Sequence, residues 1–143
     1  MTLFHATCVN LRDGGALLRG PSGGGKSDLA LRIIDTGGRL VADDYVILSV
    51  QGNRVIAAAP ETIKGLLEIR GVGVVEVPYT SSCEVKLIVD LVAADAVPRL
   101  PEPATEDLAG VPVPRIALDA RQASAPAKIR MALKTSRSHM RLA

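Results

Sequence analysis

Residues 17–27 have the sequence Leu17-Leu18-Arg19-Gly20-Pro21-Ser22-Gly23-Gly24-Gly25-Lys26-Ser27, and this stretch decides the fold of the chain. It contains the pattern G-x-x-x-x-G-K-[ST], which is typical of loops that bind the phosphates of nucleoside triphosphates. Such a loop curls its backbone N–H groups around phosphate oxygens, so it needs glycines that tolerate unusual dihedral angles and allow close approach. The predicted cofactor-binding residues are Gly20, Pro21, Ser22, Gly23, Gly24, Gly25, Lys26 and Ser27.

The two side chains that end this loop have different predicted roles. Lys26 is expected to reach the β- and γ-phosphates of ATP, and the hydroxyl of Ser27 is expected to bind Mg²⁺. The partial positive charge at the start of the following helix favours the same anion. We expect Lys26 to face solvent until nucleotide binds.

The segments on either side of the loop support this interpretation. Ala16-Leu17-Leu18 is an apolar run that predicts a short buried strand. After the loop, apolar residues recur at helical spacing from Leu29 to Ile34, and Gly37-Gly38 predicts the end of that helix. The alternative is a glycine-rich turn that binds nothing, and the strand–loop–helix context disfavours it.

Length and composition are those of one globular domain. The chain has 143 residues, of which 48% are hydrophobic and 22% charged. Its only aromatic residues are Phe4, Tyr45 and Tyr79. The core must therefore be aliphatic, and the base stacking that single-strand nucleic-acid binders use is not expected. We predict a single domain over residues 1–143 and no nucleic-acid partner.

Several features favour a cytoplasmic protein with no membrane association. No apolar run approaches the roughly 20 residues of a membrane span, and residues 1–10 lack the basic and apolar regions of a signal peptide. Cys8 and Cys83 lie far apart in sequence without metal-ligand spacing. We interpret both as small buried hydrophobic residues in a reducing compartment.

A pair of acids follows the next predicted strand. Arg39-Leu40-Val41-Ala42 is a strand candidate that ends in Asp43-Asp44. Mg²⁺-nucleotide sites of this class place an acid at a strand end opposite the phosphate loop. The alternative is a strand-end turn or a helix cap. In a strand the two side chains point to opposite faces, so unequal roles are expected for Asp43 and Asp44.

Elsewhere the pattern predicts an α/β fold with several strands and a final helix. His5 lies inside the first predicted strand, where a lone histidine is usually half-buried. Ile129, Leu133 and Met140 are expected to face inward from the final helix. The predicted strands cover residues 3–9, 45–50, 54–58 and 84–92, and the final helix covers residues 127–140.

Three further stretches have open interpretations. Residues 68–75 are a salt-bridged surface strand, or a strand whose Gly71 and Gly73 allow close approach of a ligand. Residues 97–115 hold five prolines, and we expect a mobile loop there without a central strand. Residues 121–143 carry six basic and no acidic residues, which predicts either a solvated helix face or a docking surface for an acidic partner.

Three of these motifs together resemble the catalytic domain of the bacterial HPr kinase/phosphorylase family. They are the loop at residues 20–27, Arg39-Leu40-Val41-Ala42-Asp43-Asp44, and Leu66-Leu67-Glu68-Ile69-Arg70-Gly71-Val72-Gly73, in this order. The resemblance is specific over residues 2–92 and loose beyond them. The Glu-Ile-Arg-Gly run is the most telling part, since ordinary phosphate-loop ATPases lack it.

The resemblance implies a phosphate-loop kinase domain built on a mixed β-sheet flanked by helices. Its relatives use ATP and Mg²⁺ to phosphorylate a serine of the phosphocarrier protein HPr, and they assemble as hexamers. By matched position, Asp44 corresponds to the general base, Glu68 to a metal ligand and His5 to an active-site histidine. Lys26 and Ser27 correspond to phosphate and metal ligands, Asp43 is a second candidate metal ligand, and Arg99 corresponds to a catalytic arginine.

Two departures from the family pattern affect what the resemblance implies. The sequence begins directly at the kinase domain, so regulation through a separate N-terminal domain is not expected. Residues 118–124 do not match the family's segment for dephosphorylation, which leaves the reverse, phosphorolytic reaction in doubt. The rival functions are a nucleotide-binding regulatory module without transferase activity and a small-molecule kinase. An acid at Asp44 beside the phosphate loop counts against the first, and the second needs a substrate pocket for which the chain is short.

Overall fold

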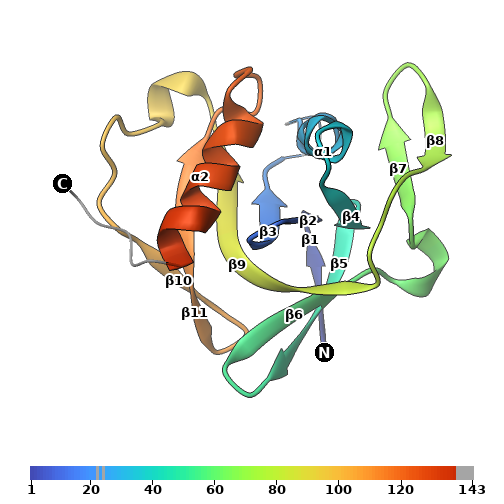
Figure 1. Cartoon of the computed structure of the whole chain (residues 1–143), viewed down its shortest axis with the longest axis horizontal. Helices are drawn as coiled ribbons and strands as arrows, with labels where there is room; N and C mark the ends of the chain where they lie inside the picture. Colours follow the sequence, from blue (N-terminus) through green and yellow to red (C-terminus); the bar gives the residue numbers. More distant parts are fainter. Residues whose placement is uncertain (22, 24, 138–143) are drawn as a thin grey trace.

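The structure is a computed structural model that describes residues 1–21, 23 and 25–137. These residues form a mixed α/β fold in which a curled sheet carries two α-helices on one face (Figure 1). The helical elements are α1 (Lys26–Asp35), η1 (Glu61–Ile63), η2 (Ala94–Ala96) and α2 (Ala125–Arg137). The α/β class expected from the sequence is confirmed. No helix in this part of the chain is long and apolar enough to cross a membrane.

The strands are short except for one. They are β1 (Thr2–His5), β2 (Thr7–Leu11), β3 (Gly14–Arg19), β4 (Arg39–Ala42), β5 (Tyr45–Gln51), β6 (Arg54–Ala58), β7 (Leu66–Ile69), β8 (Gly73–Glu76), β9 (Ser82–Leu91), β10 (Thr105–Leu108) and β11 (Val111–Leu118). Within the described residues nine of them form one sheet with the path β1-β5-β6-β9-β3-β2-β4, to which β11 and β10 add beside β9. The hairpin β7–β8 stands apart from this sheet (Figure 1).

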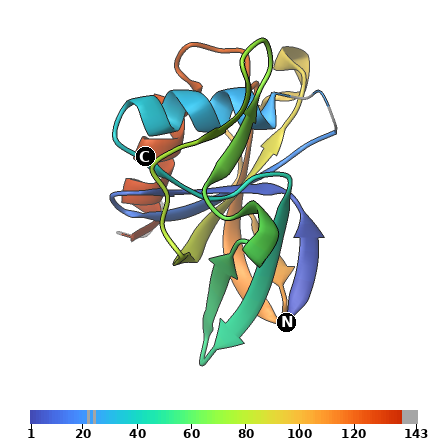
Figure 2. The ribbon, with the colours of Figure 1, turned by 90° about the vertical axis from the view of Figure 1, so that its right-hand side faces the viewer.

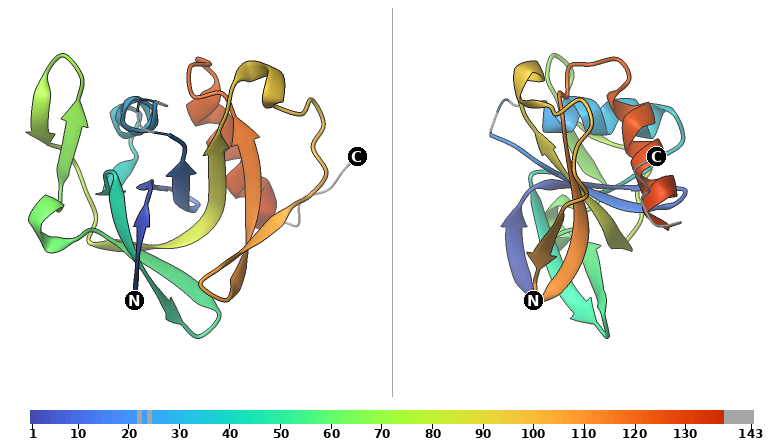
Figure 3. Two further views of the ribbon diagram at one scale, coloured as in Figure 1. Left: turned by 180° about the vertical axis from the view of Figure 1, so that it is seen from behind. Right: turned by 90° about the vertical axis from the view of Figure 1, so that its left-hand side faces the viewer.

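The long strand β9 joins the two parts of the sheet. Its first residues pair antiparallel with β6, and its remainder pairs in parallel with β3. Figure 3 shows β9 curving between these two partners. Apolar cores cover both faces of the sheet at β9, so Leu87 and Val89 on one face and Ile88 on the other are all fully buried.

Several strand ends converge on one edge of the sheet. Strands β3 and β11 both run parallel to β9. Strand β4 is antiparallel to β2, which is antiparallel to β3, so β4 runs in the direction of β3. The chain therefore leaves β3, β4, β9 and β11 at the same edge, where α/β proteins commonly bind their ligands.

The sheet separates two apolar cores. Leu18 of β3 packs with Leu29 and Ile33 of α1 and with Ile129 of α2 on one face. Leu17, its neighbour in the same strand, belongs to the cluster on the opposite face. Alternation along β3 thus holds α1 on the sheet and fixes where the phosphate loop starts. The inward positions predicted for Ile129 and Leu133 are confirmed, and Met140 lies outside the described residues.

The two cysteines lie in the second core. Cys8 of β2 is buried, and its Sγ atom is 3.9 Å from Sγ of Cys83 in β9. The hydrogen bond with Cys83, together with burial, raises the pKa of the Cys8 thiol well above its usual range. A thiol held protonated in this way packs as a small hydrophobic residue, as predicted.

The expectation of a strand-free loop over residues 97–115 is wrong for its second half. Residues 105–118 form the hairpin β10–β11, and β11 continues along β9. The turn residues Ala109 and Gly110 both have positive φ, 53° and 90°, as a two-residue type I′ hairpin requires. Alanine at the first turn position is a weak sequence signal, which is why the hairpin was not expected.

The prolines of β11 fit the ladder because of their register. Pro112 and Pro114 lie opposite Asp107 and Thr105, while Leu108 and Val111 close the turn. In an antiparallel ladder closed in this way, Val111 and Val113 donate their N–H groups to β10. The prolines fall on the alternate positions, so their missing N–H groups remove no bond to β10.

The other predicted elements occur with small shifts. The strand at 39–42 and the hairpin of β5 and β6 are confirmed, whereas the first predicted strand is divided at Ala6 into β1 and β2. Helix α1 ends as expected, because the N–H groups of Gly37 and Gly38 donate to Ile34 and Ile33. Residues 68–75 are part of a hairpin, and a Cβ atom added at Gly71 or Gly73, at its turn, would meet no described atom within 4 Å.

Candidate functional site

The phosphate loop, the end of β4 and the hairpin β7–β8 enclose a cleft of about 520 Å³. Residues 25–28 and Leu31 line one side of this cleft, and Glu68, Ile69 and Arg70 line the other. Asp43 and Asp44 line it between them. Figure 2 shows α1 and the hairpin β7–β8 beside each other above the sheet. The cleft therefore brings together three of the sequence motifs.

The end of the phosphate loop packs closely against the turn that follows β11. Gly25, at the start of α1, has φ 91°, and a Cβ atom there would lie 3.1 Å from Cβ of Ala120. Arg32 of α1 donates to the carbonyl oxygens of Ala120 and Gln122. The backbone N–H of Arg121 holds the pKa of Asp119 below its usual range and fixes the same turn. A glycine at position 25 is thus required by both conformation and space. Ser22 and Gly24 lie outside the described residues.

Lys26 does not face solvent, which corrects the expectation from its motif. Its side chain is only 6% exposed. The Nζ atom donates to the carbonyl oxygens of Gly20 at 2.7 Å and Pro21 at 3.1 Å. The ammonium group therefore satisfies the carbonyls of its own loop, and it must leave them to reach a phosphate.

Asp43 is a buried carboxylate that collects donors from three elements. It accepts hydrogen bonds from Oγ of Ser27 at 2.8 Å and from Oγ1 of Thr7 at 3.2 Å. Its second oxygen accepts the backbone N–H of Glu68 at 3.1 Å. Asp43 thus links α1, β2 and β7, and its contact with Ser27 places an acid and a hydroxyl together beside the phosphate loop.

Asp44 has a different environment from its neighbour. Its side chain is 57% exposed, and Oδ1 lies 2.7 Å from Nε2 of His5, whose ring is 44% exposed. Asp44 has φ 69°, the left-handed region, where aspartate is one of the few tolerated residues. Its backbone N–H donates to Oγ1 of Thr7 at 3.1 Å. The two acids thus have different surroundings, and a turn rather than strand alternation produces the difference. Their unequal roles stay a prediction.

Glu68 reaches the cleft from β7. Its side chain is exposed and its backbone N–H is fixed by Asp43. Among the described residues no three His, Cys, Asp or Glu side chains are close enough to hold a metal ion by themselves. Mg²⁺ commonly takes one or two carboxylates and fills its other positions with phosphate oxygens and water. Ser27, Asp43 and Glu68 supply oxygen donors of that kind.

The structure does not bring Arg99 to this cleft. Arg99 is exposed in the segment after η2 and is not among the described residues that line the cleft. Conversely, sequence reasoning missed Thr7 and Arg70. Thr7 is fully buried and bonds to both acids, and its local sequence gives no signal of that role. Arg70 was visible only as part of the Glu-Ile-Arg-Gly run.

The chemistry of the cleft suits a phosphate-bearing ligand and a divalent cation. Lys26 and the start of α1 supply positive charge at one end. Asp43 and Glu68 supply hard oxygen donors, and Asp44 is a half-exposed carboxylate paired with His5. These are the groups that phosphoryl transfer needs.

Comparison with known proteins gives a consistent result. A family model described as the HPr Serine kinase C-terminal domain matches residues 1–140. This chain belongs to that family.

Individual members of the family show how far the similarity extends. The chain is 39% identical over 104 residues to an HPr kinase/phosphorylase from Exiguobacterium sp., covering 67% of this chain and 33% of that protein. It is 34% identical over 130 residues to an HPr kinase/phosphorylase from Verminephrobacter eiseniae, covering 82% and 41%. It thus spans a third to two fifths of the length of these curated relatives.

A solved structure shows that the family's fold is retained. The Hpr(Ser) kinase/phosphatase from Coxiella burnetii superimposes with a TM-score of 0.86 at 29% identity, covering 98% of this chain and 93% of that one. The curled mixed sheet described above is therefore the fold of this family.

Proposed function

We propose that this domain is an ATP- and Mg²⁺-dependent serine kinase domain that phosphorylates an HPr-like phosphocarrier protein. Family membership supports the reaction class, and the names of the relatives supply the acceptor. The single observation that carries the proposal is the contrast between two adjacent acids in one cleft. Asp43 is buried against Ser27, while Asp44 is exposed toward an incoming group.

The binding step uses the phosphate loop and its lysine. Loop N–H groups and the start of α1 receive the phosphates, and Lys26 exchanges the carbonyls of Gly20 and Pro21 for phosphate oxygens. Ser27, Asp43 and Glu68 would hold Mg²⁺, which when bound would neutralise phosphate charge. The hydrogen bond from Ser27 to Asp43 already places a hydroxyl and a carboxylate side by side beside the loop.

In the transfer step the acceptor hydroxyl loses its proton to Asp44. The serine oxygen forms a bond to the γ-phosphorus as the bond from that phosphorus to the β–γ bridging oxygen breaks, and ADP leaves. The hydroxyl proton passes to the Asp44 carboxylate. His5, 2.7 Å from Asp44, orients this carboxylate. Phosphorolysis of the product forms no part of the proposal.

The Asp44→Asn variant tests the proposal. Asparagine tolerates the left-handed backbone that position 44 requires, so the fold should be kept. The variant removes the proton acceptor, and transfer to a purified phosphocarrier protein should fall by roughly 10² to 10⁴. Binding of Mg²⁺-ATP, measured by calorimetry, should be retained or strengthened, because one negative charge near the triphosphate is lost.

The matched control is Asp43→Asn, which changes the neighbouring acid in the same way. Because Asp43 joins Ser27, Thr7 and Glu68, this variant should weaken nucleotide binding or lower the thermal midpoint. Equal transfer rates for wild type and Asp44→Asn would remove the general-base role. A wild-type domain that binds Mg²⁺-ATP but phosphorylates no phosphocarrier protein would instead be a nucleotide-binding regulatory module.

A further inference from the structure

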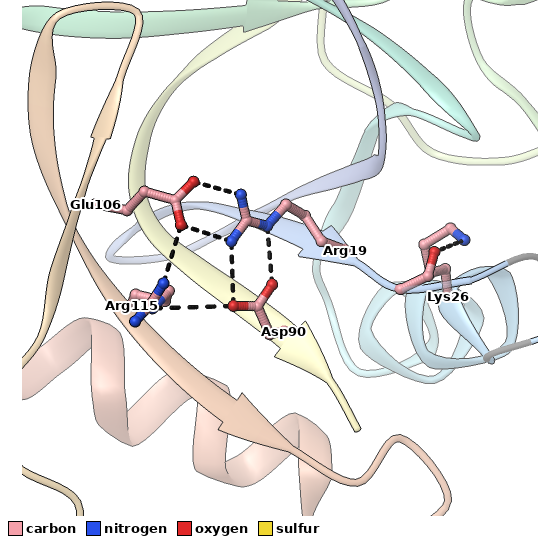
Figure 4. Close-up of polar contacts among 6 residues, drawn as sticks. Arg19, Lys26, Asp90, Glu106 and Arg115 are labelled. Atoms are coloured by element: carbon pink, nitrogen blue, oxygen red, sulfur yellow. Dashed lines mark hydrogen bonds and ion pairs between the residues drawn. The ribbon is translucent and has the colours of Figure 1, made fainter. Parts of the chain in front are cut away.

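A network of four charged side chains lies beside the start of the phosphate loop. Arg19, at the end of β3, donates from Nε and Nη2 to Asp90 of β9 at 2.8 and 3.1 Å. It also donates from Nη1 and Nη2 to Glu106 of β10 at 2.5 and 2.8 Å. Arg115 of β11 donates to Glu106 at 3.1 Å and lies 3.9 Å from Asp90. Figure 4 shows the Arg19 guanidinium between the carboxylates of Asp90 and Glu106, with hydrogen bonds to both.

The network continues the core on the face of the sheet opposite α1. Arg19 follows Leu17 on that face, and Asp90 follows Ile88 in the paired strand. Leu108, two residues after Glu106, belongs to the same core. The network therefore closes this core at the edge where the phosphate loop begins, and it attaches the hairpin β10–β11 there.

The geometry favours an anchor rather than a loose surface pair. The side chains of Arg19, Asp90 and Glu106 are 25%, 30% and 29% exposed. Both of the Arg19 contacts are two-pronged, the arrangement in which a guanidinium and a carboxylate orient each other best. Hydrogen bonding to Glu106, then to Asp90, raises the pKa of Arg19, and the bond from Arg19 lowers the pKa of Glu106. Arg19 and Glu106 thus stay charged around neutral pH.

Arg19 immediately precedes the two residues that hold Lys26. The carbonyls of Gly20 and Pro21 accept the Lys26 ammonium, as Figure 4 shows for one of them. When Lys26 turns to a phosphate, these carbonyls lose that partner. The restraints that remain at this end include the pairing of Arg19 with Asp90 in the β3–β9 ladder, the side-chain network of Arg19, and the packing of Gly20 on Leu91, whose Cβ would lie 3.3 Å from a Cβ at Gly20.

We infer that the Arg19–Asp90–Glu106–Arg115 network is a positioning device for nucleotide binding. It fixes the start of the phosphate loop while Lys26 changes partners, so the loop loses less conformational freedom when phosphate enters. It also makes the position of the loop depend on the hairpin β10–β11. This inference rests on the proposed function only in taking a nucleoside triphosphate as the ligand; it does not need transfer to a protein.

Three variants and one control test the role of Arg19. Arg19→Gln removes the charge and both two-pronged contacts, Arg19→Lys keeps the charge, and Glu106→Gln weakens the link to β10 alone. The control is Arg54→Gln, because Arg54 also pairs across strands, with Glu84 at 3.9 Å, but outside the network. Each protein is measured for Mg²⁺-ATP affinity by calorimetry, for its thermal midpoint without ligand, and for amide hydrogen exchange over residues 17–29.

A positioning role gives a different result from simple attachment of the hairpin. Arg19→Gln should weaken Mg²⁺-ATP binding by about tenfold and speed exchange in the loop, because ordering the loop now opposes binding. Arg19→Lys should show most of this loss despite its charge, since an ammonium cannot form both pairs of contacts. Arg54→Gln should bind like wild type. Attachment alone would lower the thermal midpoint and leave affinity and loop exchange unchanged.

The outcomes separate this inference from the kinase proposal. Wild-type affinity in folded Arg19→Gln or Arg19→Lys would overturn the positioning role and leave the kinase proposal standing. Weakened binding in these variants, from a wild type that binds ATP but transfers nothing, would support the positioning role and overturn the kinase proposal. A wild type that does not bind Mg²⁺-ATP would overturn both. If Arg19→Gln does not fold, the Mg²⁺-ATP affinities and loop exchange rates of Arg19→Lys and Glu106→Gln test the positioning role instead.

Discussion

At the scale of single residues, one backbone dihedral separates the surroundings of two identical side chains. Asp44 has φ 69°, which turns its carboxylate toward His5 and the exposed part of the cleft. Asp43 keeps its carboxylate inside, where Ser27, Thr7 and the Glu68 N–H satisfy it. Thr7 stabilises both arrangements, because its hydroxyl donates to Asp43 and accepts the backbone N–H of Asp44. This buried threonine therefore fixes the turn that gives the two acids different surroundings.

Lys26 should contribute to stability as well as to nucleotide binding. Its ammonium is 6% exposed and donates to two loop carbonyls, so Lys26→Met should cost about 1–3 kcal/mol of unfolding free energy, the range for hydrogen bonds from a charged group. Thermal unfolding without ligand measures this loss. The same variant should lose most of the rise in midpoint that ATP gives wild type.

The exposed lysine Lys128 of α2 provides the control for this experiment. Lys128→Met removes the same charge from a solvent-facing position and should leave the unliganded midpoint nearly unchanged. If Lys26→Met unfolds at the wild-type temperature, the two carbonyl contacts of Lys26 contribute nothing to the unliganded fold. The expectation from the motif alone would then be right.

At the scale of elements, the hairpin β10–β11 is where the sequence was most misleading. Prolines argued against a strand, yet Pro112 and Pro114 occupy positions whose N–H groups the β10 ladder does not use. The hairpin is also joined to β3 and β9 by Glu106, across 87 residues of sequence from Arg19. A proline-rich stretch is thus ordered here by register and by long-range charge pairing.

The attachment of this hairpin should weaken in acid. The hydrogen bond from Arg19 is the main cause that lowers the pKa of Glu106 below its value in the unfolded chain. The Glu106 carboxylate therefore binds a proton less readily in the folded state than in the unfolded state. The stabilisation is fully present above the ordinary pKa of about 4.3 and is lost as pH falls toward the lowered folded value. Unfolding free energies of wild type and Glu106→Gln, measured by denaturant from pH 7 downward, check this.

The predicted quantity is the difference in unfolding free energy between wild type and Glu106→Gln. It should be constant from about pH 7 to 5.5 and shrink below about pH 4.3, as Glu106 becomes protonated in wild type. Glu61→Gln serves as the control, because Glu61 is exposed and its ion pair, within the part of the chain that the structure describes, is with the nearby Lys64. A difference that does not change with pH would show that the Glu106 carboxylate is not what holds the hairpin.

At the scale of the whole molecule, local patterns predicted the parts of the site but not how they meet. The glycine loop, the strand at 39–42 and the acid pair were each visible, because turn chemistry and apolar spacing are short-range signals. Thr7 meets Asp43 across 36 residues, and Arg19 meets Asp90 across 71. Such contacts follow from strand order, which no local pattern encodes. The inward position of Lys26 depends likewise on the backbone conformation that turns the carbonyls of Gly20 and Pro21 toward its ammonium group.

The basic face of α2 gives a last prediction, about recognition of a protein partner. Lys128, Arg130 and Lys134 are exposed on α2, and α1 lies between α2 and the hairpin β7–β8 (Figure 1). An acidic acceptor that contacts this face while its serine enters the cleft must therefore extend over α1.

If it does, Lys128→Glu with Lys134→Glu should raise the KM for the acceptor and leave Mg²⁺-ATP affinity unaltered, because like charges slow association. The effect should fade between about 50 and 300 mM salt as screening grows. Initial rates of acceptor phosphorylation, measured against acceptor concentration at each salt concentration, give both quantities. A KM that responds neither to charge reversal nor to salt would make this surface a solvated helix face.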